Sequence, residues 1–165
     1  MEDPTPFTVA QPRPSDWADL ARIHVQAWRE TYSSLLPARF FGDEALRKRE
    51  DMWRSSLSHP DAAERIRVAR VDGRPVGFAI HGPSRDTPPV RPLELFTLYV
   101  LAAHHGTGAG QALLDSAIGD APASLWVAEE NPRARRFYAR NGFARDGAHR
   151  VEDDLEDLAE VRLVR

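Results

Sequence analysis

The sequence contains no cysteine and only one lysine, Lys48, against 21 arginines. Without cysteine, the protein cannot form a disulfide, a thiolate metal site or a cysteine acyl-enzyme. Charge of neither sign dominates, because the formal net charge is −3 over 165 residues. No strong global field therefore attracts the chain to nucleic acid or to an anionic membrane, and we expect neither as a partner.

Long apolar runs are also absent. No segment reaches the roughly 20 consecutive apolar residues that a membrane-spanning helix needs. The first residues, Met1-Glu2-Asp3-Pro4, lack the basic and apolar regions of a signal peptide. We therefore expect a cytoplasmic protein, and a length of 165 residues suits one domain with a sizeable core that spans residues 1–165.

Short alternating apolar segments are interspersed with amphipathic ones, which predicts an α/β (α+β) fold. Strands are predicted at residues 7–10, 65–71, 75–80, 93–100, 125–127, 144–151 and 160–164. Helices are predicted at residues 14–32 and 43–57, after the glycines near residue 108, and at 132–140. Asp72-Gly73 predicts a hairpin turn, and four prolines between residues 82 and 92 predict a loop.

A glycine-rich segment separates the predicted strand 93–100 from the helix that follows it. Its glycines are Gly106, Gly108 and Gly110. Glycine allows positive φ and close approach of a ligand to the backbone, and the first amides of a helix lack intrahelical partners. The segment therefore predicts a phosphate or pyrophosphate site, although a tight turn uses the same residues. The dinucleotide-binding fingerprint Gly-x-Gly-x-x-Gly needs a third glycine where Gln111 stands, so the segment does not match it. A P-loop needs a Gly-Lys pair, and the sequence contains none.

A second segment, residues 131–143, predicts a short helix after the strand 125–127. Asn131 is a good N-cap residue, and Pro132 suits the first helical position. Asn141-Gly142 tolerates the left-handed conformation that ends a helix. The residues that share the apolar face, at i, i+3 and i+4 spacing, are Ala134, Phe137 and Tyr138.

These two segments resemble the two signatures of the GNAT superfamily of N-acetyltransferases. The first signature is usually Gln/Arg-x-x-Gly-x-Gly/Ala, and here His105 stands in place of the Gln or Arg but can still donate a hydrogen bond. The second, Asn-x-x-Ala-x-x-x-Tyr-x-x-x-Gly-Phe, matches residues 131–143 at every position. The resemblance implies a GNAT fold: a central, mixed, mostly antiparallel twisted sheet of about seven strands flanked by about four helices, with the acyl-CoA loop between strand 4 and helix 3.

The resemblance also implies a reaction, in which the acetyl group of acetyl-CoA, the co-substrate, moves to a primary amine by direct attack in a ternary complex. Tyr138 would be the general acid near the CoA sulfur; the alternative is a core aromatic residue. The backbone around Tyr99 would pair with the pantetheine arm. The implied acyl-CoA contacts are Leu98, Tyr99, Val100, His105, Gly106, Thr107, Gly108, Ala109, Gly110, Gln111, Asn131 and Tyr138.

Glu94 is the candidate base, because family members place a Glu at this offset to accept the amine proton. Period-two alternation puts Glu94 on the same strand face as Phe96 and Leu98. The alternatives are an exposed residue at the strand end and a salt bridge to one of the many arginines. Trp28 and Tyr32, at i and i+4, would wall the acceptor pocket, with core packing as the other interpretation.

The resemblance implies a small-molecule or peptide amine as acceptor and leaves monomer and homodimer open. We expect no metal, because His104-His105 has no ligands at metal-site spacing. The acidic residues near 152–157 form either a solvated loop or an attraction for a cationic acceptor. Two other classes of protein remain: a non-catalytic acyl-CoA sensor or assembly module on the same fold, and a nucleotide-binding α/β domain.

Overall fold

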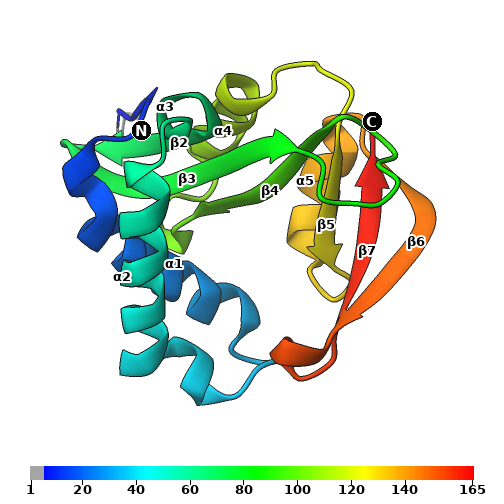
Figure 1. The fold of residues 1–165 in the computed structure, drawn as a ribbon, viewed down its shortest axis with the longest axis horizontal. Helices are drawn as coiled ribbons and strands as arrows, with labels where there is room; N and C mark the ends of the chain where they lie inside the picture. The colour runs from blue at the N-terminus through cyan, green and yellow to red at the C-terminus, as the bar shows by residue number, and fades with distance from the viewer. Residues whose placement is uncertain (1–5) are drawn as a thin grey trace. The chain divides into compact units, whose positions relative to one another are not determined.

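The computed structural model describes residues 6–165, so the expectation about a signal peptide at residues 1–4 lies outside it. Seven strands form one mixed sheet in the order β1-β2-β3-β4-β5-β7-β6 (Figure 1). β4 and β5 pair in parallel, whereas β1–β2, β2–β3, β5–β7 and β6–β7 are antiparallel. The predicted mixed, mostly antiparallel sheet with flanking helices is therefore confirmed.

Contacts between Cα atoms divide the chain into two compact units, Met1–Ile80 with Thr97–Gly119 and His81–Phe96 with Asp120–Arg165. The helices of the first unit are α1 (Trp17–Tyr32), α2 (Asp43–Ser58), α3 (Ala62–Arg65) and α4 (Ala109–Ala117). Its strands are β1 (Thr8–Ala10), β2 (Ile66–Val71) and parts of β3 (Arg74–Pro83) and β4 (Leu93–Val100). The second unit holds the rest of β3 and β4, with β5 (Ser124–Ala128), α5 (Pro132–Arg140), β6 (Ala144–Glu152) and β7 (Leu158–Val164).

The end of β3 and a short additional helix differ from the sequence prediction. β3 continues to Pro83, beyond the predicted end at residue 80 and into the predicted loop. Gly82 and Pro83 suggest a loop, but proline is tolerated where a strand ends because its missing N–H removes little of the ladder. The short helix α3 was not predicted, since four residues are too few to show a helical period.

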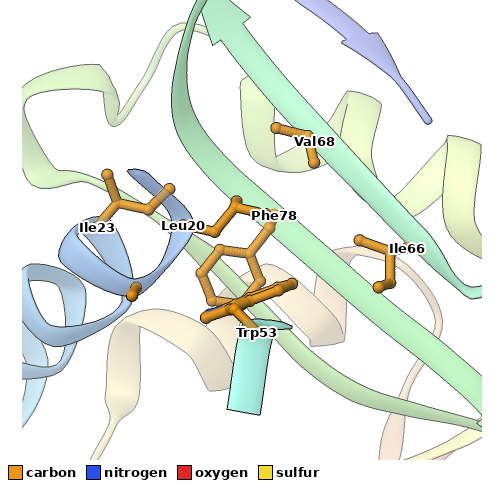
Figure 2. Packing of buried hydrophobic residues seen from close by; sticks show 7 residues of the cluster. Leu20, Ile23, Trp53, Ile66, Val68 and Phe78 are labelled. Atoms are coloured by element: carbon orange, nitrogen blue, oxygen red, sulfur yellow. The ribbon is translucent and has the colours of Figure 1, made fainter. Parts of the chain in front are cut away.

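The core of the first unit lies between α1, α2 and the β2–β3 hairpin. α1 and α2 pack against each other beside these strands (Figure 1). The buried residues of this cluster are Leu20, Ala21, Ile23, Trp53, Ile66, Val68 and Phe78. Figure 2 shows Phe78 lying next to both Leu20 and Trp53, and the Phe78 and Trp53 rings meet edge to face with centroids 4.9 Å apart. Both helices are therefore held on one face of the sheet by apolar burial.

The hairpin that joins β2 and β3 turns at Asp72-Gly73, as predicted. Asp72 has φ of 50° and Gly73 has φ of 78°. Positive φ at both central residues is the mark of a type I′ turn, whose twist suits the flanking strands. This short turn sets the register in which Val68 faces Phe78 across the ladder.

β3 approaches β4 very closely at Gly77. A Cβ added there would lie 2.7 Å from the Tyr99 carbonyl oxygen, 3.1 Å from Val100 Cγ2 and 3.3 Å from Leu113 Cδ1. Leu113 belongs to α4, so alternation along β3 places α4 on the face opposite Phe78. Glycine at position 77 thus allows the end of β4 and helix α4 to sit against β3 together.

A buried ion pair joins the start of α1 to β2. Arg70 Nη1 donates to Asp16 Oδ1 at 2.9 Å, Arg70 Nη2 donates to Asp16 Oδ2, and the Arg13 backbone N–H also donates to Asp16 Oδ2, at 2.6 Å. Burial by itself raises the pKa of Asp16, but the hydrogen bonds and positive charge of Arg70 outweigh it and leave that pKa below its ordinary value. The pair is therefore fully ionised in the folded protein near neutral pH.

In the second unit, β5 and β6 both pair with β7, and the parallel ladder between β4 and β5 consists of Glu94–Ser124 and Leu95–Leu125. Asp86, in the loop after β3, accepts a hydrogen bond from Trp126 Nε1 at 3.0 Å and from Arg162 Nη1 at 3.4 Å. These bonds fasten the loop to β5 and β7. Among residues 6–165, no helix is long and apolar enough to cross a membrane.

Candidate active site

The glycine loop leads directly into helix α4. Gly106 has φ of 77°, and Gly108, the N-cap residue of α4, has φ of 91°. A Cβ at Gly106 would meet no protein atom within 4 Å, and at Gly108 it would lie 3.9 Å from the Phe7 ring. Positive φ, and not crowding, is therefore what requires glycine at both positions, and the space beside the loop backbone is open to a ligand.

Thr107 and His105 hold this loop in place. Thr107 Oγ1 donates to the His104 carbonyl oxygen at 2.7 Å and accepts the Ala109 N–H at 3.3 Å. The His105 ring nitrogen Nε2 lies 2.8 Å from the Val100 carbonyl oxygen, so it carries the proton and donates it. His105 thus ties the loop to the end of β4, in addition to any bond that it makes to a ligand.

Helix α5 begins and ends as its sequence predicts. Asn131 Oδ1 accepts the Ala134 N–H at 3.1 Å, which confirms Asn131 as the N-cap. Tyr138 is 6% exposed, and its ring contacts those of Phe137 and Phe143, with centroid distances of 5.2 Å and 5.8 Å. The ring of Tyr138 therefore packs in the core, and the role of its hydroxyl remains a prediction.

Glu94 is almost completely buried, at 1% exposure, so the interpretation of an exposed residue at a strand end is wrong. Its Oε2 accepts the Arg85 backbone N–H at 2.9 Å and Arg85 Nε at 3.3 Å. The Arg85 guanidinium lies 4.0 Å from the Phe96 ring centroid, which agrees with Glu94 and Phe96 sharing a face of β4. The carboxylate is therefore ion-paired in the structure, as the second alternative anticipated, and its role as a base remains a prediction.

Arg85 was not identified from the sequence. It lies in the proline-containing loop, directly before Asp86, whose bonds to Trp126 and Arg162 fasten that loop. Among 21 arginines, nothing in the sequence singles out the one that pairs with Glu94. The structure thus places the positively charged side chain of Arg85 beside the carboxylate of Glu94, the candidate base.

Aromatic side chains of α1 gather against β4 in the first unit. The Trp28 and Tyr32 rings are 4.9 Å apart at an angle of 63°, and the Tyr32 and Tyr99 hydroxyl oxygens lie 3.3 Å apart. His24 Nδ1 accepts Trp53 Nε1–H at 3.1 Å, so His24 has a structural partner in the core. Burial, and then the charge of Arg49, lower the pKa of His24 well below its ordinary value, so this ring is neutral at physiological pH.

Arg49 of α2 completes this cluster and was also missed. Its guanidinium carbon lies 4.7 Å from the Trp28 ring centroid. The sequence contains one signal for it, since Arg49 falls between Leu46 and Trp53 at the i, i+3 and i+4 spacing of the apolar face of α2. A basic residue on an apolar helix face is unusual and points to a specific partner.

The predicted site residues divide between the two units. The first unit contains Trp28, Tyr32, Leu98, Tyr99, Val100 and the loop from His105 to Gln111, and the second contains Glu94, Asn131 and Tyr138. β4 carries residues of both groups along one strand, Glu94 near its start and Val100 at its end. Within residues 6–165, no group of three or more His, Cys, Asp or Glu side chains could hold a metal ion.

Two sequence comparisons bear on the family of the protein. The sequence model of the Acetyltransferase (GNAT) family matches residues 17–143. The "Uncharacterized N-acetyltransferase YuaI" of Bacillus subtilis is 30% identical over 163 residues, which cover 94% of this chain and 88% of that protein.

Solved structures show the same fold. The crystal structure of PH1933 from Pyrococcus horikoshii superposes with a TM-score of 0.72 at 20% identity, covering 97% of this chain and 98% of that one. The PaiA N-acetyltransferase of Thermoplasma acidophilum, solved in complex with coenzyme A, gives a TM-score of 0.70 at 18% identity over 95% of this chain and 98% of that one. The fold that the two sequence signatures imply is thereby confirmed.

Proposed function

Because the chain belongs to the GNAT acetyltransferase family, we propose that it moves the acetyl group of acetyl-CoA to a primary amine by direct attack in a ternary complex. The observation that carries this proposal is the glycine loop at the start of α4, whose positive-φ backbone lies open beside the end of β4. A pyrophosphate suits this position, since the first amides of a helix lack intrahelical partners and lie at the positive end of its dipole.

The remaining CoA contacts follow along β4. The backbone of Leu98, Tyr99 and Val100 pairs with the pantetheine arm as an added strand would, and a backbone N–H there holds the thioester oxygen. Gly77 supports this geometry from the other side, because it lets β3 lie against the Tyr99 carbonyl. Asn131 supports it through the start of α5, which carries Tyr138.

The transfer itself needs two proton movements. The neutral amine nitrogen attacks the thioester carbon, a C–N bond forms, and the C–S bond breaks as its electron pair goes to sulfur. Glu94 accepts the proton that the nitrogen loses, and Tyr138 gives its proton to the departing thiolate. For Glu94 to do this, Arg85 must give up its place beside the carboxylate, or the proton must pass through water.

The direct test is release of CoA thiol from acetyl-CoA across a panel of small primary amines, peptide N-termini and lysine side chains. Amine-dependent release above the rate of acetyl-CoA hydrolysis is expected. Acetyl-CoA binding without release for any amine would favour a non-catalytic sensor or assembly module on the same fold. We also propose that residues 1–165 act as one cytoplasmic domain without a metal, a membrane or a nucleic-acid partner.

Glu94→Gln keeps the shape of the side chain and removes the base. Turnover is expected to fall most near neutral pH and to recover partly at alkaline pH, where more of the amine is already neutral. A pH–rate profile for both proteins measures this. Glu129→Gln is the matched control, because Glu129 is an exposed carboxylate that is also paired with an arginine, Arg145. A Glu94→Gln profile that is parallel to the wild type at every pH would place the base elsewhere.

Gly108→Glu tests the loop. A negative charge at the start of α4 opposes the pyrophosphate, so the affinity for acetyl-CoA is expected to fall about tenfold or more. Positive φ strains any side chain here by roughly 1 kcal/mol. Gly73→Glu therefore serves as the control, because Gly73 in the β2–β3 turn has φ of 78° and a Cβ there would meet no protein atom within 4 Å. Calorimetry that gives the same acetyl-CoA affinity for folded Gly108→Glu and the wild type would overturn the loop assignment.

A further inference from the structure

The aromatic cluster of Trp28 and Tyr32, where we expect the acceptor to bind, contains the positively charged Arg49, which has no carboxylate partner in the described chain. Among residues 6–165, the polar and charged contacts of Arg49 are the Trp28 ring, 4.7 Å from its guanidinium carbon, and Met52 Sδ, 3.9 Å from Nη1. No carboxylate in the described chain lies within ion-pair distance of it. Burial lowers the pKa of Arg49 from its ordinary value, which marks a guanidinium that has lost much of its water.

A second donor beside Arg49 also lacks an acceptor. Trp28 Nε1 is buried and has no hydrogen-bond partner in the described chain. Buried donors are satisfied in most folded proteins, so an orphaned indole N–H on the ring that the guanidinium covers is unusual. Trp28 Nε1 and the Arg49 guanidinium both donate, and the one hydrogen-bond acceptor that Arg49 has in the described chain is the weakly accepting Met52 sulfur. A group that satisfies both donors is therefore an acceptor.

The neighbouring side chains do not balance the charge. His24 is neutral, because burial and Arg49 itself lower its pKa, and the other members of the cluster are aromatic rings. Tyr99 lies close enough to act electrostatically on Arg49. Within residues 6–165, Arg49 thus lies on Trp28 and near Tyr99 with no carboxylate paired to it, so an anion there would be held by little-screened attraction.

Arg54, on the same helix, is also stacked on an aromatic ring and provides a comparison for the exposure and ion pairing of Arg49. Arg54 lies 3.8 Å from the Trp17 ring centroid, but its side chain is 51% exposed and it is paired with Asp51 at 3.4 Å. Arg49 differs from Arg54 in being half-buried and unpaired. Cation–π stacking alone therefore does not account for Arg49.

We propose that Arg49 binds a carboxylate of the acceptor, so that the substrates are primary amines that also carry a carboxylate. This inference rests on the proposed acetyl transfer. The planar guanidinium matches a carboxylate in charge and in its two-pronged hydrogen-bonding geometry, and Trp28 holds it in place from one face. The aromatic rings around it suit the apolar part of such an acceptor.

Two acceptor pairs test this proposal: L-phenylalanine against phenethylamine, and γ-aminobutyrate against propylamine. The wild type is expected to prefer the carboxylated member of at least one pair by about tenfold or more in kcat/KM for CoA release. Arg49→Met should abolish that preference, and Arg54→Met should keep it. Arg49→Lys retains the positive charge but loses the two-pronged guanidinium geometry, so it should reduce the preference for the carboxylated acceptor. This variant keeps the proposal testable if Arg49→Met does not fold.

The outcomes separate this proposal from the acetyl transfer itself. Release with amines but without preference for a carboxylate in either pair, or a preference that survives in Arg49→Met, overturns the role of Arg49 alone. If no amine causes release, the proposed transfer is contradicted. Calorimetry of L-phenylalanine and γ-aminobutyrate with the CoA-loaded protein then tests the Arg49 site, and absence of binding for both would overturn it. A drop in acetyl-CoA affinity in Arg49→Met, without a change in preference, would assign Arg49 to the CoA phosphates and overturn the proposal.

Discussion

Replacing Tyr138 by phenylalanine is expected to lower kcat by about 10²–10⁴-fold, the usual effect of losing a general acid. The change removes one proton donor and keeps the ring, which packs against Phe137 and Phe143. A fall near the lower end is expected, because a thiol of ordinary pKa, about 8.5, leaves partly unaided as thiolate. The KM for acetyl-CoA should move far less, since the proton matters mainly as charge develops on sulfur.

Packing must be separated from proton transfer in this experiment, because Tyr138 is a core residue as well. Loss of one hydroxyl from a packed ring should cost about 0.5–1.5 kcal/mol of stability. Phe143→Leu is the control, since it disturbs the ring that contacts Tyr138 and leaves the hydroxyl in place; its Tm should fall while kcat stays within about tenfold of the wild type. If Tyr138→Phe retains kcat to within about twofold, Tyr138 serves packing only.

Replacing Arg70 by methionine is expected to lower the free energy of unfolding by about 3–5 kcal/mol, because it leaves the Asp16 carboxylate buried without its partner. Denaturant titration at neutral pH measures this. Arg74→Met, at the exposed start of β3, removes the same charge from the same hairpin and should cost about 0.5 kcal/mol or less. Asp16→Asn with Arg70→Met removes both charges and should be less destabilising than Arg70→Met alone.

The pH dependence of stability identifies the origin of this loss. In the wild type, the pKa of Asp16 is lowered, so the stability it contributes is present above the ordinary carboxyl pKa, about 3.9, and is lost as pH falls through the lower folded value. In Arg70→Met the lowering by Arg70 is lost, and only Arg13 still opposes the effect of burial on the pKa of Asp16. That pKa is therefore higher than in the wild type, and protonation relieves the buried charge as pH falls. The two proteins should therefore converge in stability on acidification; a constant difference would mean that lost packing, not charge, is responsible.

Local features of the chain were predictable because their causes lie within a few residues. The positive φ that Asp72-Gly73 supplies, the Asn131 N-cap and the glycines before α4 each act on their immediate neighbours. The same is true of the two signatures, whose spacing identified the family before any tertiary contact was known. Where local cues conflict, as in the continuation of β3 through Gly82 and Pro83, the prediction was wrong.

The state of the candidate base could not be read in this way. Besides a catalytic role, the sequence left two interpretations of Glu94: an exposed carboxylate and a carboxylate in an ion pair. They differ only in what surrounds the side chain. The ion pair forms because Asp86 fastens the loop that carries Arg85 to β5 and β7. The contact between Arg85 and Glu94 depends on strands that lie far apart in the sequence, so no local pattern predicts it.

By itself, the sequence determined the type and order of the strands and of the longer helices, the turn and cap residues and the family of the protein, because hydrophobic period and backbone preference are short-range properties. Only the tertiary structure decided which arginines face which partners: Arg70 meets Asp16 across 54 positions, Arg85 covers Glu94, and Arg49 stacks on Trp28 without a carboxylate. Apart from the helical spacing of Arg49, nothing in the sequence distinguishes these residues among the 21 arginines. Folding distinguishes them, because a charge becomes strongly coupled to its neighbours only where water is removed.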